Sequence, residues 1–100
     1  MTRYTLSPLA RADLDNIWEH TSRRWDDDQA EAYLRMIQTA IETVAANPKL
    51  GRRYDEIRAG YRRHRAGSHL IMYRERSDAI DIVRVLHEKM DIGSHLPDLN

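Results

Sequence analysis

Two stretches in the first half of the chain repeat their apolar residues at the spacing of an α-helix. The first begins at Ser7-Pro8, where a hydroxyl side chain followed by proline is typical of a helix start, and should end near Arg24 or Trp25. The second follows the acidic run 26–28, whose carboxylates suit a helix N-terminus, and stops at Asn47-Pro48. Because the joint between them is short, we expect an antiparallel helix hairpin.

The second half has the shorter apolar segments and turn residues of β-strands. We predict a loop at 48–60 and then three strands, at residues 61–66, 69–75 and 79–86. The tight turns between these strands imply an antiparallel meander, and an alternating segment at 3–6 should add a strand at one edge. The pattern therefore predicts an α+β fold: an N-terminal strand, then an antiparallel two-helix hairpin packed on a three- to four-stranded antiparallel sheet.

The last predicted strand is apolar on both faces. Strict alternation directs Ile80, Ile82 and Leu86 to one face and Val83 and Val85 to the other. The helix hairpin can cover one face, but little of the chain remains for the other, so a partner chain is expected there. On the first helix, Trp18 and Trp25 fall in the apolar stripe, and aromatic residues at such spacing usually belong to the core.

The totals indicate one small domain, which we place at residues 1–96 with a frayed tail at 97–100. The absence of cysteine fits a reducing compartment. No apolar run is long enough to cross a bilayer, and the N-terminus lacks the apolar core of a secretory signal. We therefore expect a cytoplasmic protein with no membrane contact.

Charge is balanced overall, with 16 basic and 16 acidic residues, but it is unevenly distributed. Residues 52–65 hold six arginines against two acids, whereas residues 13–31 hold seven acids against two arginines. The basic stretch, which includes Arg62, Arg63 and Arg65, suits an acidic protein partner, a solvated strand edge or nucleic acid. Zero net charge argues against a chain whose main task is binding a phosphate backbone, so direct nucleic-acid binding is not expected.

Arg84 and His87 are the most unusual residues of the last predicted strand. Arg84 interrupts an apolar face and needs a carboxylate partner, for which a helix residue such as Asp13 is a candidate. His87 could act as a general acid or base, or could bond the backbone at the strand exit. The other histidines show no metal-ligand spacing, and no glycine-rich phosphate loop is present, so we expect neither metal nor cofactor.

Three stretches, in this order, resemble the ParE/RelE superfamily of toxins from bacterial type II toxin-antitoxin modules. They are LSPLARADLDNIWEHT at 6–21, NPKLGRRYDEIRAGYRRHRAGSHLIMYR at 47–74 and IDIVRVLHEKMD at 80–91. The pattern is most similar to the ParE branch. The resemblance implies a toxin that inhibits DNA gyrase by binding and is neutralised by a cognate ParD-like antitoxin, a ribbon-helix-helix protein with an acidic C-terminal segment.

Two alternatives stay open. The RelE branch cuts messenger RNA on the ribosome, and under that reading the catalytic groups would be His87, Arg65 and Arg62. However, Glu88 follows His87 where some nuclease members carry an aromatic residue. The second alternative is a non-toxic binding module that acts in operon autoregulation. Under the leading interpretation no residue is catalytic, and the predicted partner-binding residues are Arg62, Arg63, Arg65, Val83, Arg84, Val85 and His87.

Overall fold

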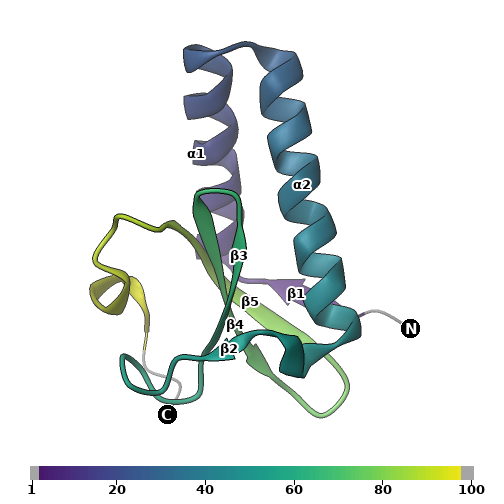
Figure 1. Ribbon diagram of the computed structural model, residues 1–100, viewed down its shortest axis with the longest axis vertical. Coiled ribbons are helices and arrows are strands. Elements are labelled where there is room, and N and C mark those ends of the chain that lie inside the picture. Colours follow the sequence, from purple (N-terminus) through teal and green to yellow (C-terminus); the bar gives the residue numbers. More distant parts are fainter. Residues whose placement is uncertain (1–2, 98–100) are drawn as a thin grey trace.

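The computed structural model describes residues 3–97 and places a helix hairpin against a twisted sheet (Figure 1). The elements follow in the order β1 (Tyr4–Leu6), α1 (Pro8–Arg24), α2 (Asp27–Ala46), the 3₁₀ turn η1 (Pro48–Leu50), β2 (Arg52–Arg53), β3 (Arg62–Ala66), β4 (His69–Glu75), β5 (Ile80–His87) and the 3₁₀ turn η2 (Ile92–His95). The predicted α+β class and helix hairpin are confirmed.

The sheet has five strands in the order β1-β5-β4-β3-β2, one more than the largest number predicted. The additional strand, β2, has two residues and lies inside the predicted loop, where it pairs antiparallel with β3. The N-terminal strand lies at the edge, as predicted, but it runs parallel to β5. The predicted tail lies outside the described residues except for Pro97, whose carbonyl oxygen accepts a hydrogen bond from the Tyr61 hydroxyl.

Both helices start as the sequence predicts. The Ser7 hydroxyl accepts a hydrogen bond from the Ala10 backbone N–H at 3.0 Å, and Pro8 occupies the first turn. The same hydroxyl donates to the Val83 carbonyl oxygen at 2.7 Å, so one side chain caps α1 and attaches it to β5. The Asp26 carboxylate caps α2 by accepting from the Gln29 N–H at 2.7 Å.

The main core lies between the hairpin and one face of the sheet, which we call the helix face. Its buried residues come from α1, α2 and the strands, and include Ile37, Ile41, Ile71, Tyr73 and Ile82. The Tyr73 hydroxyl donates to the Pro48 carbonyl oxygen and accepts from the Gly51 N–H, so it fastens the end of α2 and its following turn to the sheet.

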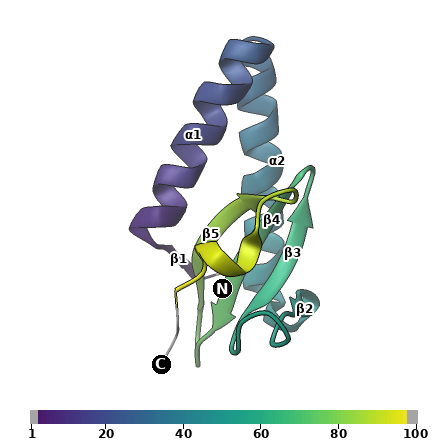
Figure 2. The same ribbon diagram turned by 90° about the vertical axis from the view of Figure 1, so that its left-hand side faces the viewer.

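The opposite face, which we call the far face, carries a second buried cluster. Its members are Tyr54, Tyr61, Leu70, Met72, Val83, Leu86, Ile92 and Leu96. Figure 2 shows η2, in yellow, on the side of the sheet opposite α2. The sequence suggested a partner chain for this face, but the loop after β2 and the C-terminal segment of the same chain pack on it.

A β-bulge changes the faces of the last strand. Tyr73 pairs with Ile82 and Met72 pairs with Arg84, so Val83 is an extra residue in β5. As a result Val85 joins Ile82 in the helix-face core, while Val83 and Leu86 join the far-face cluster. Val83 faces away from Ile82, as predicted, but the inserted residue reverses the side chains that follow it, so Val85 and Leu86 lie on the faces opposite to those predicted.

The two tryptophans of α1 are not core residues. Trp18 is 38% exposed and Trp25 is 66% exposed. In both views the tip of the hairpin extends beyond the sheet (Figures 1 and 2). The apolar stripe of α1 continues past the end of the surface that it packs against, and these residues are left at the tip.

Candidate partner-binding site

Arg84 and Asp13 form a closed ion pair between β5 and α1. The Arg84 Nε and Nη2 atoms each donate to one oxygen of Asp13 at 2.8 Å, and the two side chains are 14% and 11% exposed. This bidentate bond raises the pKa of Arg84. The predicted pairing with Asp13 is confirmed.

The same pair also organises the backbone around it. An Asp13 oxygen accepts from the Val85 N–H at 2.9 Å, and Arg84 Nη1 donates to the His95 carbonyl oxygen at 3.1 Å. Asp13 thereby occupies the edge of β5 beyond the end of β1, and Arg84 connects this edge to the C-terminal segment. The position of Arg84 is explained by these structural bonds.

His87 lies at the exit of β5 and accepts a hydrogen bond at Nδ1 from the Lys89 backbone N–H, at 3.1 Å. This is the backbone contact that the sequence indicated as the alternative to catalysis. Its ring meets the His69 ring edge to face, with 5.2 Å between the ring centroids. His69 pairs with His87 across β4 and β5, so the two imidazoles are cross-strand neighbours.

Sequence reasoning missed His69 and its partner Tyr33. The Tyr33 hydroxyl, on α2, lies 2.7 Å from His69 Nδ1 and accepts from the Ser68 N–H at 3.0 Å. Burial, followed by the proximity of His87, lowers the pKa of His69. The signal that could have found this pair is the strand register, because the Gly67-Ser68 turn fixes where His69 begins β4, but its register against β5 depends on the bulge.

The arginines of the basic stretch are mostly bound to acids of the same chain. Arg62 is held by Glu75 and by the Gly51 carbonyl oxygen, and Arg65 is paired with Glu88. The Arg62 bond lowers the pKa of Glu75, and the Arg65 bond lowers that of Glu88.

Arg63 differs from Arg62 and Arg65, because its guanidinium lies over the Tyr54 ring, 4.7 Å from the ring centroid. For Arg63 and Arg52, no carboxylate partner occurs among residues 3–97. Much of the positive charge of the basic stretch is therefore neutralised within the chain. Arg63 and Arg52 carry most of the charge that is left.

The predicted partner-binding residues do not form one surface. Val83 and Val85 are buried on opposite faces of the sheet. Arg84 and His87 line a groove of about 350 Å³ between α1 and the end of β5. Arg62 and Arg63 line two other hollows, and Arg65 shares the hollow of Arg63. Of the three residues of the nuclease reading, Arg62 lies apart, since it pairs with Glu75 near the other end of β4, whereas Arg65 pairs with Glu88, the residue after His87.

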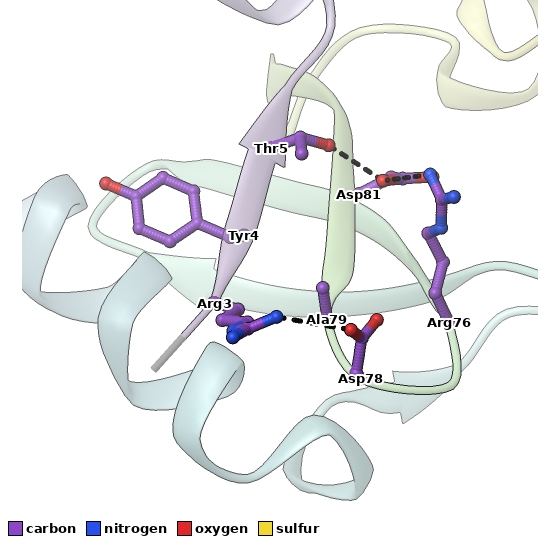
Figure 3. A pocket seen from close by; sticks show the side chains of 7 residues that line it. All are labelled: Arg3, Tyr4, Thr5, Arg76, Asp78, Ala79 and Asp81. Carbon is purple, nitrogen blue, oxygen red and sulfur yellow. Dashed lines mark hydrogen bonds and ion pairs between the residues drawn. The ribbon is translucent and has the colours of Figure 1, made fainter. Parts of the chain in front are cut away.

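A further hollow, of about 490 Å³, lies beside β1 and the β4–β5 turn (Figure 3). Its central carboxylate, Asp81, accepts hydrogen bonds from Thr5, Arg74 and Arg76. Burial opposes ionisation of Asp81, but these bonds outweigh it and lower the pKa. At the rim, Arg3 pairs with Asp78. Because its acids and bases are already matched, this hollow is a structural ion cluster across the strands.

Within residues 3–97 no cluster of histidine and acidic side chains has the arrangement needed to hold a metal ion. The helices described are also too short or too polar to span a membrane.

Comparison with known proteins agrees with these observations. A family model described as the ParE toxin of the type II toxin-antitoxin system parDE matches residues 4–92. Toxin ParE1 of Mycobacterium tuberculosis is 54% identical over 96 residues, which cover 95% of this chain and 98% of that protein. Toxin ParE1 of Caulobacter vibrioides is 44% identical, with 96% and 99% covered.

A solved structure described as the chromosomal ParDE TA system from P. aeruginosa has the same fold. Its TM-score is 0.76 at 19% identity, and the match covers 87% of this chain and 96% of that one. The family model and these relatives match nearly the whole chain, from β1 through the RVLH sequence at residues 84–87 of β5. The chain belongs to the ParE toxin family of type II toxin-antitoxin systems.

Proposed function

We propose that this protein is a toxin that acts in the cytoplasm by binding and inhibiting DNA gyrase, and that a cognate ParD-like antitoxin neutralises it. The observation that carries the proposal is near full-length similarity to Toxin ParE1 proteins, at 54% and 44% identity. Inhibition by binding requires a preformed surface and no reacting groups. The antitoxin would compete by folding an acidic segment across the toxin.

The side-chain geometry favours binding over RNA cleavage. A nuclease needs a base, a cation for the developing phosphorane charge and an acid at one linkage. Here Arg62 and Arg65 are bound to Glu75 and Glu88, and Arg62 lines a different hollow from His87. These ion pairs within the chain support a toxin that makes and breaks no covalent bond.

The deciding experiment measures three activities of the purified chain. We expect inhibition of gyrase-catalysed supercoiling, accumulation of cleaved DNA with gyrase present, and unchanged translation on purified ribosomes. Blocked translation with unaffected supercoiling would overturn the gyrase assignment and favour the nuclease reading. His87→Ala then serves as the control, because a catalytic His87 would make the variant non-toxic, whereas a binding toxin retains growth arrest.

The antitoxin is tested separately by co-expression with the reading frame next to this gene. We expect a stable complex, and growth arrest only when the toxin is induced alone. If induction without the partner leaves growth unchanged, the protein is a non-toxic module of its operon and the toxin proposal is wrong.

A further inference from the structure

The groove between α1 and the end of β5 contains three imidazoles on otherwise largely apolar walls. His20 comes from α1, His69 from β4 and His87 from β5, while Ile17 and Met90 contribute apolar surface. The groove is about 350 Å³ in volume, enough for one or two side chains of a partner. It lies where β1 has ended and α1 alone runs beside β5.

Hydrogen bonds at Nδ1 orient two of these rings. The Tyr33 hydroxyl accepts from the Ser68 N–H and lies 2.7 Å from His69 Nδ1. His87 Nδ1 accepts from the Lys89 N–H, so the neutral His87 ring carries its proton on Nε2. With the Tyr33 proton directed to His69 Nδ1, the neutral His69 ring has the same tautomer. Among residues 3–97 both rings form their hydrogen bonds through Nδ1, so both Nε2–H donors remain for a ligand.

The charged groups around these rings are already matched. On α1, Asp13 is saturated by Arg84 and by the Val85 N–H. Beyond β5, Glu88 is bound to Arg65 of β3 and Lys89 adds one positive charge, while α2 contributes only the neutral Tyr33. The polar groups left to line the groove are mainly hydrogen-bond donors, and none of them is an acceptor as strong as a carboxylate. Such a groove suits an anionic acceptor.

The occupant enters as a side chain. An added strand would need the free backbone edge of β5, but the Asp13 carboxylate already accepts the Val85 N–H on that edge. The Ser7 hydroxyl likewise donates to the Val83 carbonyl oxygen. Ser7, which caps α1, and Asp13 therefore block the addition of a strand at this edge of β5. Only the space in front of the imidazole rings stays accessible.

We propose that this groove binds the carboxylate of one aspartate or glutamate side chain from the acidic segment of the antitoxin, with the Nε2–H groups of His69 and His87 as its donors. The inference rests on the proposed antitoxin. The methylene groups of the bound side chain pack against Ile17 and Met90. His20 also lines the groove.

The site makes binding depend on pH. In the free protein, burial and the neighbouring ring hold the pKa of His69 below its ordinary value. A bound carboxylate favours the charged imidazole and raises that pKa, so the complex takes up protons. Affinity therefore rises as the pH falls from about 8 to about 6, as long as the partner carboxylate stays ionised.

The first test needs no antitoxin. The ring signals of the isotope-labelled chain are titrated with pH by NMR, in acetyl-Ala-Glu-Ala-amide or in its Gln twin. We expect the Glu peptide to raise the pKa of His69 and to shift the ring signals of His87, and the Gln peptide to leave both unchanged. His64, half-buried on β3 outside the groove, is the internal control and should respond to neither. Equal responses to both peptides, or a response of His64 alone, overturn the proposal.

The second test uses the complex and two variants of His87. Asn keeps an acceptor near Nδ1 for the Lys89 N–H but removes the Nε2 donor, whereas Gln places an amide donor near Nε2. We expect His87→Asn to weaken antitoxin binding about tenfold or more. His87→Gln should bind like wild type at pH 8 and lose part of the gain at pH 6, because His69 is still present.

His64→Gln should leave both affinity and pH dependence unchanged. A tight complex whose affinity ignores His87→Asn and pH overturns this site but leaves the proposed function intact. Failure to form any complex instead overturns the antitoxin assignment, and the peptide titration then decides the groove by itself.

Discussion

The two faces of the sheet are covered by very different parts of the chain. The helix face packs against α1 and α2, two regular elements of 17 and 20 residues. The far face packs against the loop after β2 and the segment around η2, in which the longest regular element has four residues. Both clusters are buried to a similar degree. Burial alone therefore does not distinguish a face held by rigid elements from one held by short irregular segments.

The difference should appear in the free energy of local opening. A helix loses its packing only as a unit, whereas an irregular segment with few backbone hydrogen bonds can detach by itself. Side chains of other elements bond to the backbone of the C-terminal segment, such as Tyr61 to the Pro97 carbonyl oxygen and Arg58 to that of Gly93. We expect the far-face cover to open before the helix hairpin does.

The largest expected effect on the free energy of unfolding comes from substitutions that leave a cavity in the core on each face. Ile41→Ala, in α2, should lower the free energy of unfolding by about 4 kcal/mol, because two helices and a sheet cannot collapse into the space. Ile92→Ala, in η2, should cost only about 2 kcal/mol, because a short segment can shift inward. Urea unfolding measures both. Equal losses would mean that the far-face cover is as rigid as the hairpin.

A second test breaks the Asp13–Arg84 ion pair, which connects α1 to β5 and, through the His95 carbonyl oxygen, to the C-terminal segment. Asp13→Ala leaves Arg84 and the Val85 N–H without their acceptor and should cost about 3 kcal/mol. Because Arg84 also bonds to the His95 carbonyl oxygen, hydrogen exchange should speed up in the C-terminal segment as well as at the start of α1. The double variant Asp13→Leu with Arg84→Met is the control and should recover much of the loss. If it does not, the pair stabilises the fold through its own hydrogen bonds, including those with the Val85 N–H and the His95 carbonyl oxygen.

How far the sequence could predict the molecule follows the same division. Helix periodicity, Ser7-Pro8 and Asn47-Pro48 located the hairpin, since these signals act within a few residues. The far-face cover has no period, so nothing in residues 52–61 or 91–97 indicated that they would pack on the sheet. The Asp13–Arg84 pair could be predicted because a buried guanidinium requires a carboxylate.

The candidate site was predicted only in part, for one local reason. The bulge at Val83 depends on how β4 and β5 pair, and alternation counted along one strand cannot reveal it. It moved Val85 into the helix-face core. The contact of His69 with His87 could not be predicted for a related reason, since the two are cross-strand neighbours and are not close in sequence.

Two tyrosines allow a finer comparison of the faces. Tyr73→Phe removes a hydroxyl that donates to the Pro48 carbonyl oxygen and accepts from the Gly51 N–H, and should cost about 2 kcal/mol. Tyr61→Phe removes the bond to the Pro97 carbonyl oxygen and should cost about 1 kcal/mol. Thermal unfolding checks both values. A larger loss for Tyr61 would show that the C-terminal segment contributes more to far-face stability than its length suggests.

The smallest effect concerns the polar part of the far face, where Asp81 bonds to Thr5 and Arg74 across the strands (Figure 3). The pKa of Asp81 is lower in the folded protein than its ordinary value, so its contribution to stability is complete above that value and is lost as pH falls through the folded pKa.

Asp81→Asn should therefore be less stable than wild type above about pH 5, and the two free energies of unfolding should converge toward pH 2. Urea unfolding across this range measures the difference. Asp78→Asn, which removes an equal charge from the exposed Arg3 pair, is the matched control and should differ less from wild type at neutral pH. A constant gap between Asp81→Asn and wild type at every pH would mean that this polar half of the far face is stabilised by side-chain packing. It would then be stabilised in the same way as the apolar part of the far face.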